Sequence, residues 1–242
     1  MRITFLGTAH GIPERDRRCS STLIEIGDSL YLVDMGCMAV EDLRRMEKAV
    51  ESVRAVFLTH MHGDHVNGLP AFADLCSWYF TSADPAILLP AEKGCEALRT
   101  WLSCLDTGMR DLDIRSYESA VPGVIYDDGT LRVTAFKTLH TATSHALLVE
   151  AEGKRILFTG DLKHPSEDYP SEVFGTRLDL AVCETAHFTP DAYLPVWEKS
   201  DVRTAVLQLV QPRKEPLARQ LADEKKDAPR VLVGTDGLTL EL

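Results

Sequence analysis

Short apolar runs of strand length dominate the first third of the sequence. They are rich in β-branched residues and are bounded by turn residues such as Gly27-Asp28, a pattern that predicts β-strands. We expect strands at residues 3–6, 22–26, 30–33, 55–58 and 86–89. Between the strands, apolar residues recur at helical spacing. This periodicity predicts helices over residues 40–50, from Asp64 to about Tyr79 and from Ala91 to about Leu105.

The second half repeats the same order of elements. Strands are expected at residues 131–137, 145–151, 155–159, 180–183, 205–210, 231–233 and 238–240. Helices are expected over residues 190–199 and 215–227. The Asp127-Asp128-Gly129 turn marks the midpoint, and no low-complexity linker separates the halves. This order predicts an α/β fold in which residues 1–242 form a single domain, with two packed mixed sheets and helices on the outer faces.

Charge and composition narrow the classes of partner. The 242 residues carry a formal net charge of −11, so the average field repels polyanions. We therefore expect no nucleic-acid partner and no anionic membrane surface. The longest apolar runs are strand-sized and no signal sequence is visible, which predicts no membrane span and a cytoplasmic location. The six cysteines form no C-x-x-C pair, so buried reduced thiols are expected.

The strand at 55–58 leads into the stretch LTHMHGDHVNGLP, which places four metal-ligating side chains within six residues: His60, His62, Asp64 and His65. His60 and His62 flank Met61, so both imidazoles can point the same way, whereas Asp64 and His65 can face a second position. Gly63 supplies the backbone freedom that such a turn needs. Imidazole and carboxylate ligands suit zinc, iron or manganese, so the stretch predicts a metal site.

One metal needs three or four protein ligands, so further ligands are expected downstream. His140 ends the apolar run TAFKTLH, and Asp161 lies in ILFTGDL at the end of another strand. Strand ends that meet along one edge would bring His60, His140 and Asp161 together. A carboxylate in this position can bridge two metals, as hydrolytic dinuclear sites require.

The sequence resembles the metallo-β-lactamase-fold hydrolases, whose H-x-H-x-D-H motif matches residues 60–65, and the resemblance runs nearly end to end. The opening stretch FLGTAHGIPERDRRCSSTLIEIGDSLYLVDMG is similar to that of the ribonuclease Z and phosphodiesterase branch. That branch has a G-T-x-x-G-x-P loop, an R-x-x-S-S segment and a D-x-G. The matching residues here, with the two serines slightly shifted, are Gly7, Thr8, Gly11, Pro13, Arg18, Ser20, Ser21, Asp34 and Gly36.

The resemblance implies a four-layer αββα sandwich and a site for two divalent metal ions, zinc by default, with manganese or iron as alternatives. Six side chains are implied as ligands: His60, His62 and His140 on the first metal, Asp64 and His65 on the second, and Asp161 bridging both. Asp34 would lie behind the metal-binding loop and orient its ligands. Asp64 would also act in catalysis by holding the attacking water in line.

The chain departs from this family at one ligand. The family supplies a further histidine to the second metal, in a strand that reads roughly L-T-H, and the matching segment AVLQLVQPRK has Leu209 there. Three interpretations stay open. In the first, the second metal position is weak but still works with Asp64, His65 and Asp161. In the second, His187 replaces the missing histidine ligand or acts as general acid. In the third, only the first metal is held, or the protein has lost hydrolysis and senses metal or ligand.

Other polar candidates near these segments each have two interpretations. Glu184 and His187 form either a functional pair near the leaving group or a hydrogen-bonded loop pair outside the site. His10 and His145 either line the pocket or have structural contacts. For His164 we expect a structural role.

The implied function is metal-dependent hydrolysis of a small phosphodiester or related ester. The alternatives are a lactone or thioester hydrolase, and a degenerate member that binds metal or ligand without turnover, which Leu209 motivates. Ribonuclease Z proteins carry a protruding arm that grips tRNA, whereas residues 84–126 here have few basic residues, which favours a small-molecule substrate. The aromatic run Trp78-Tyr79-Phe80 is expected to pack in the core rather than line the substrate. Self-association as a homodimer is left open.

Overall fold

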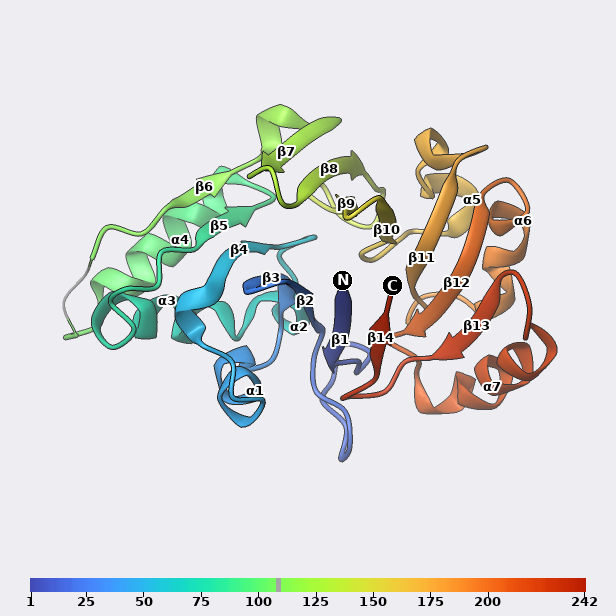
Figure 1. Ribbon diagram of the computed structural model, residues 1–242, viewed down its shortest axis with the longest axis horizontal. Coiled ribbons are helices and arrows are strands. Elements are labelled where there is room, and N and C mark those ends of the chain that lie inside the picture. The colour runs from blue at the N-terminus through green and yellow to red at the C-terminus, as the bar shows by residue number, and fades with distance from the viewer. Residues whose placement is uncertain (108–109) are drawn as a thin grey trace.

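The computed structural model describes residues 1–107 and 110–242. Within this part of the chain, the strands form two seven-stranded sheets that lie face to face (Figure 1). The first sheet has the order β14-β1-β2-β3-β4-β5-β6. Its strands, in chain order, are β1 Arg2–Gly7, β2 Ser21–Ile26, β3 Ser29–Met35, β4 Val53–Phe57, β5 Ala86–Leu89, β6 Ile114–Ser116 and β14 Thr239–Glu241.

The second sheet has the order β13-β12-β11-β10-β9-β8-β7. Its strands are β7 Gly123–Asp127, β8 Arg132–Lys137, β9 His145–Ala151, β10 Lys154–Phe158, β11 Arg177–Glu184, β12 Asp201–Gln208 and β13 Arg230–Val233. Both sheets are mixed and use the same succession of pairings. β1 to β3 are antiparallel and β3 to β6 parallel, whereas β7 to β10 are antiparallel and β10 to β13 parallel. Parallel strands end at the same edge, so the loops after β3 and β4, and those after β10, β11 and β12, each share an edge.

Helices cover the outer face of each sheet (Figure 1). The α-helices are α1 Ala39–Arg45, α2 Gly63–Val66, α3 Leu69–Trp78, α4 Glu92–Ser103, α5 Pro165–Asp168, α6 Leu194–Trp197 and α7 Glu215–Glu224. Short 3₁₀ helices lie at Val50–Ser52, Glu118–Ala120, Ser171–Val173, Pro190–Tyr193 and Pro212–Lys214. No helix within residues 1–107 and 110–242 combines the length and the apolar composition needed to span a membrane.

Three clusters of buried apolar side chains separate the layers. The central cluster lies between the sheets and includes Phe5, Phe57 and Phe158. A second, around Phe72, packs α1, α3 and α4 onto the first sheet. A third, around Trp197, packs α6 and α7 onto the second sheet. The expected four-layer αββα sandwich with mixed sheets is therefore confirmed.

The helix expected from Asp64 to about Tyr79 is in fact two helices, α2 and α3, separated at Asn67-Gly68. The Gly68 amide donates to the Met35 carbonyl over 2.8 Å, and a Cβ at this glycine would lie 2.0 Å from the Cys37 carbonyl oxygen. Only glycine allows so close an approach, and this contact with β3 interrupts the helix.

Two other expected helices are also shorter than their periodicity indicates. The helix expected over residues 40–50 ends at Arg45, and Glu47 has a positive φ of 56°. The segment 190–199 divides into a 3₁₀ helix and α6, because Pro195 has no amide hydrogen to donate to the preceding turn. Among the cysteines, Cys104 is exposed and Cys19 is half-buried, so the expectation of buried thiols is wrong for these two.

The sequence pattern does not predict β6 or β7. β6 has three residues, and the side chains of β7 are half-buried or exposed, so neither strand shows a clear alternation. The chain crosses from the first sheet to the second between these strands. The Asp127-Asp128-Gly129 turn is therefore a β7–β8 hairpin inside the second sheet, and not the midpoint of the fold.

Arg18 and Asp236 tie the loop after β1 to the turn that precedes β14. Asp236 accepts hydrogen bonds from the Arg18 amide at 2.8 Å, from Arg18 Nε at 3.3 Å and from Thr8 Oγ1 at 2.8 Å. Arg18 Nη1 also donates to Asp42 on α1 at 2.6 Å. The turn held in this way leads into β14, which pairs with β1 and completes the first sheet.

Asp236→Ala is expected to lower the free energy of unfolding by about 2 kcal/mol, because it removes the acceptor of three hydrogen bonds, one of them from a guanidinium. Urea unfolding followed by circular dichroism measures the change, with Asp227→Ala at an exposed position as the control. An unchanged midpoint for Asp236→Ala would mean that β14 pairing alone holds the turn.

Candidate metal centre

The predicted ligands follow strands of both sheets: His60, His62, Asp64 and His65 after β4, His140 after β8, and Asp161 after β10. A backbone hydrogen bond joins the two edges, from the His145 amide to the Thr59 carbonyl over 3.0 Å. Gly160 has a φ of 56°, and a Cβ there would lie 2.6 Å from the His145 carbonyl oxygen. Glycine at this position therefore lets the segment between β10 and Asp161 pass close to the start of β9.

Four of the predicted ligands converge on one point. The ligand atoms of His60, His62, His140 and Asp161, here called the first ligand group, all lie within 4.8 Å of one another. Asp161 Oδ2 lies 3.8 Å from His60 Nε2 and 3.6 Å from His140 Nε2. His62 Nδ1 lies 3.1 Å from His140 Nε2. Three imidazole nitrogens and a carboxylate oxygen at this spacing form a donor set that suits zinc.

The other oxygen of Asp161 faces the second ligand group, which consists of Asp64, His65 and Asp161 Oδ1. His65 Nε2 lies 3.4 Å from Asp161 Oδ1 and 3.4 Å from Asp64 Oδ2. The rings of His60 and His65 have centroids 4.1 Å apart, so the two groups are direct neighbours. Asp161 thus lies between them, where a bridging carboxylate would lie.

Buried atoms without partners test whether a metal fits these residues. Among the described residues, His60 Nε2, His65 Nε2 and Asp161 Oδ1 are buried and have no hydrogen-bond partner. Buried polar atoms almost always have a partner, and one left unpaired costs about 1–3 kcal/mol. All three atoms lie within the two ligand groups, where a divalent cation would satisfy them. The donor set therefore fits a metal.

Burial and neighbouring charge set the protonation states of the ligands. Burial, reinforced by the charge on His65, lowers the pKa of His60 to about 2, and burial also lowers the pKa of His140. Burial alone would raise the pKa of the Asp161 carboxyl, but the histidines around it, His65 foremost, hold it below its usual value. Neutral imidazoles at His60 and His140 beside an ionised Asp161 are the states that metal binding requires of these three ligands.

Asp34 holds His65 from behind the ligand groups. Its Oδ2 accepts the Nδ1–H of His65 over 2.7 Å, and its Oδ1 accepts from the Thr59 amide at 2.8 Å and the Thr59 hydroxyl at 3.0 Å. Burial opposes a charge on His65, but the carboxylates of Asp34 and Asp161 outweigh it and raise the pKa of His65 well above its usual value. Donation from Nδ1 leaves Nε2 to face Asp161, which is the orienting position expected for Asp34.

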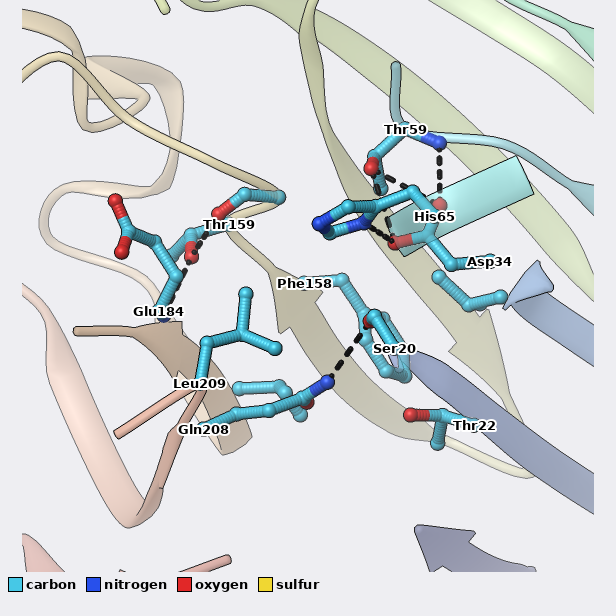
Figure 2. A pocket seen from close by; sticks show the side chains of 13 residues that line it. Ser20, Thr22, Asp34, Thr59, His65, Phe158, Thr159, Glu184, Gln208 and Leu209 are labelled. Atoms are coloured by element: carbon cyan, nitrogen blue, oxygen red, sulfur yellow. Dashed lines mark hydrogen bonds and ion pairs between the residues drawn. The ribbon is translucent and has the colours of Figure 1, made fainter. Parts of the chain in front are cut away.

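Leu209 lies just after the end of β12, where a further histidine ligand is expected. Its side chain is 3% exposed, and its φ of 58° is uncommon for leucine. It lines a cavity of about 20 Å³ with His65, Thr59, Glu184 and Gln208 (Figure 2). Such a volume holds about one water molecule. A hydrocarbon side chain without a donor atom therefore lies in the same cavity as His65 of the second ligand group.

Glu184 and His187 form a hydrogen-bonded pair at the edge of the first ligand group. Glu184 is 2% exposed, and its Oε1 accepts from His187 Nδ1 over 3.1 Å, a bond that raises the pKa of His187 above its usual value. The His187 ring centroid lies 4.6 Å from that of His140, and Nδ1 lies 3.8 Å from Asp161 Oδ2. Because Asp161 Oδ2 faces the first ligand group, His187 lies on the side of Asp161 that faces His140. It does not lie on the side that faces His65.

The remaining candidate histidines have local structural contacts. His145 is buried beside the Tyr117 hydroxyl at 3.3 Å, and burial lowers the pKa of its imidazole to about 4. His164 caps the start of α5, as expected. His10 Nε2 lies 2.9 Å from a carboxylate oxygen of Glu14 in the opening loop.

The expectation of core packing for the aromatic run is wrong at two of its three positions. Trp78 is 46% exposed and Tyr79 is 58% exposed, whereas Phe80 is buried. Because α3 ends at Trp78, the chain leaves the helix at this run, and the first two rings reach solvent.

Two solved structures share the fold over nearly the whole chain. The short form of human tRNase Z has a TM-score of 0.75 and 20% identity, covering 100% of this chain and 99% of that one. The metallo-beta-lactamase fold protein YhfI from Bacillus subtilis has a TM-score of 0.76 and 17% identity, covering 99% and 98%. The fold is therefore the metallo-β-lactamase fold, as the resemblance predicted.

Curated relatives named ribonuclease Z align with part of the chain, which confirms the resemblance to that branch. The protein from Latilactobacillus sakei subsp. sakei (strain 23K) is 31% identical over 153 residues, which are 62% of this chain and 48% of that protein. The chain thus spans about half the length of the curated relatives it matches. The expectation that nucleic acid is not a partner is wrong, since these relatives make a nucleic-acid substrate plausible. A net charge averages over the whole surface and does not describe the field at one pocket.

A family model described as anti-Pycsar protein Apyc1 matches residues 1–188. The matched span contains both ligand groups, Asp34 and the Glu184–His187 pair, and ends before Leu209. The family model thus covers the part of the chain that contains all the candidate ligands. The chain belongs to the family of anti-Pycsar protein Apyc1.

Proposed function

We propose that this chain is a metal-dependent hydrolase that cleaves phosphodiester bonds with water. The observation that carries the proposal is the first ligand group, whose four ligand atoms lie within 4.8 Å of one another. Buried atoms without a protein partner in both ligand groups support a bound cation. Similarity to proteins named ribonuclease Z supports phosphodiester cleavage over lactone or thioester hydrolysis, which such a site could also perform.

The first ligand group would hold one divalent metal ion and the second group another. Zinc suits these imidazole and carboxylate donors, with manganese and iron as alternatives. We expect the second position to be the weaker one, because Leu209 contributes hydrocarbon where a further donor is expected. Bound metal would lower the pKa of water and stabilise negative charge on the phosphate oxygens.

Two carboxylates would help to position the attacking water, one through His65 and one directly. Asp34 accepts from His65 Nδ1 and so keeps His65 Nε2 directed at the second position. Asp64 lies beside the opening loop, since a Cβ at Gly11 would be 3.7 Å from Asp64 Oδ2. We assign to Asp64 the role of holding the attacking water in line with the phosphorus.

His187 would act on the leaving-group side as general acid. Glu184 orients the ring by accepting from Nδ1, and the same hydrogen bond raises the pKa of His187, which favours the protonated form. Nε2 is the nitrogen left to donate a proton to the departing oxygen. The pair would thus combine an orienting carboxylate with a proton donor.

We propose a small phosphodiester as the substrate, with RNA as the second candidate. The described residues of 84–126 support the small substrate, because they contribute β5, α4, β6 and the start of β7 to the fold. The names of the curated relatives support RNA.

The protein loaded with zinc or manganese is expected to hydrolyse bis-p-nitrophenyl phosphate, and excess chelator should abolish the turnover. Absorbance of the released p-nitrophenolate measures the rate. Parallel assays with a lactone, a thioester and an unprocessed tRNA separate the candidate substrates. Hydrolysis of only the lactone or thioester would refute phosphodiester cleavage, and no hydrolysis of any substrate would favour a protein that binds metal or ligand without turnover.

His62→Ala is expected to remove the first metal and to lower hydrolysis by more than about 100-fold, beyond what the loss of an outer supporting residue costs. Metal content by mass spectrometry and the phosphodiester assay measure both effects. His164→Ala, which alters a histidine that caps α5, is the matched control. Retained turnover in His62→Ala would mean that His62 is not a ligand.

Leu209→His is expected to raise the affinity for the second metal by at least about tenfold, because it supplies an imidazole beside His65. Histidine also tolerates the positive φ at this position better than leucine does. Competitive titration with a chelating dye measures the affinity, and Leu209→Phe, a ring without nitrogen, is the control. Equal affinity in wild type and Leu209→His would mean that this position does not face the second metal.

A further inference from the structure

The loop that carries His187 is held by a side chain from a separate segment. Lys214, the last residue of the 3₁₀ helix Pro212–Lys214, donates from Nζ to the carbonyls of Thr185, Ala186 and Phe188 at 2.9, 2.7 and 2.8 Å. A lysine ammonium has three protons to donate. All of them are therefore directed into the backbone of residues 185–188.

Two further contacts hold the same loop against the end of β12. Gln211 Nε2 donates to the Ala186 carbonyl at 2.9 Å, and the Thr185 amide donates to the Gln208 carbonyl at 2.9 Å. Residues 185–189 lie outside the helices and strands, so regular structure does not supply partners for their carbonyls. The path of the loop thus depends on residues 208–214 together with Glu184, whose Oε2 accepts from the Ala186 amide at 2.7 Å.

The path of this loop sets how far the His187 ring reaches over the first ligand group. Glu184 fixes the direction of Nδ1 at 3.1 Å, while the backbone of residues 186–188 sets the position of the ring. The result is a centroid 4.6 Å from that of His140 and an Nδ1 3.8 Å from Asp161 Oδ2. A proton donor must lie within hydrogen-bond reach of its acceptor, and a misplacement of about 1 Å can cost roughly 100-fold in rate.

We propose that Lys214 is a positioning residue for His187: its ammonium binds three carbonyls of the loop and so holds the imidazole at the edge of the first ligand group. This inference rests on the proposed function, because it takes His187 as the proton donor to the leaving oxygen. A lysine near such a site could instead bind the phosphate of the substrate. Here backbone carbonyls accept all three of its protons, so Lys214 contributes to the placement of His187 and not to substrate affinity.

A leaving-group series on the metal-loaded full chain tests the catalytic consequence. The substrates are methyl phosphodiesters of 4-nitrophenol, 4-chlorophenol and phenol, which need increasing help from a proton donor. Lys214→Met is expected to lower kcat about tenfold for the phenyl diester and less than about twofold for the nitrophenyl diester, with KM unchanged. His187→Ala should show the same selectivity more strongly, and the double variant should lose little more, because both act through one side chain.

A second measurement needs no turnover. Hydrogen exchange of the amides in residues 184–190, followed by mass spectrometry, should become faster in Lys214→Met. Gln211→Ala removes one other donor to the same loop and should have a smaller effect in the same direction. The control is Lys226→Met, an exposed lysine in another loop, which should change neither exchange nor selectivity.

Unchanged exchange in Lys214→Met would overturn the anchoring role. Faster exchange with an equal loss of kcat on all three diesters would overturn the positioning role and assign Lys214 to general stability. A raised KM alone would overturn it and assign Lys214 to phosphate binding. A wild-type protein that hydrolyses neither these diesters nor the unprocessed tRNA would refute the proposed function, and the exchange experiment would still decide whether Lys214 holds the loop. If His187→Ala lowers the rate equally for all three diesters, His187 is not the proton donor. The positioning proposal for Lys214 is then wrong as well.

Discussion

The carboxylate of Asp161 is the group around which the whole site is arranged. It is buried, and a buried charge persists only where its surroundings compensate it. The compensation comes from imidazoles on loops of both sheets, with His140 on one oxygen and His65 on the other. Because these loops belong to different halves of the chain, the site forms only when the sandwich closes. Metal binding and folding are therefore thermodynamically coupled here.

The second ligand group is flanked by two residues with an uncommon backbone conformation. Asp34 and Leu209 both have a φ of 58°, and such strain, of order 1–3 kcal/mol, tends to concentrate at functional sites. For Asp34 the strain is offset by hydrogen bonds to Thr59 and His65. Leu209 has only a hydrocarbon side chain to contribute. The chain thus keeps the carboxylate that holds His65, whereas the side chain at position 209 offers no donor atom to the second ligand group.

Local pattern predicted those elements whose boundaries depend on local forces. The strands that flank the site follow from short apolar runs, and His60, His140 and Asp161 follow directly on such runs. Elements shaped by distant contacts were harder to predict. The long helix after Asp64 is interrupted because Gly68 contacts β3, a contact that helical periodicity does not encode. The sequence pattern does not predict β6 and β7, because short, half-exposed strands have little alternation.

The sequence by itself determined the kinds of donor atoms, their grouping into a first and a second set, and the presence of leucine at position 209. It did so because the H-x-H-x-D-H spacing and the residues that end strands are local features. Only the tertiary structure decided which oxygen of Asp161 faces which set, and on which side of it His187 lies. It also brought Lys214 onto the loop of His187. These relations join residues far apart in sequence, and their distances exist only after both sheets have packed on the central core.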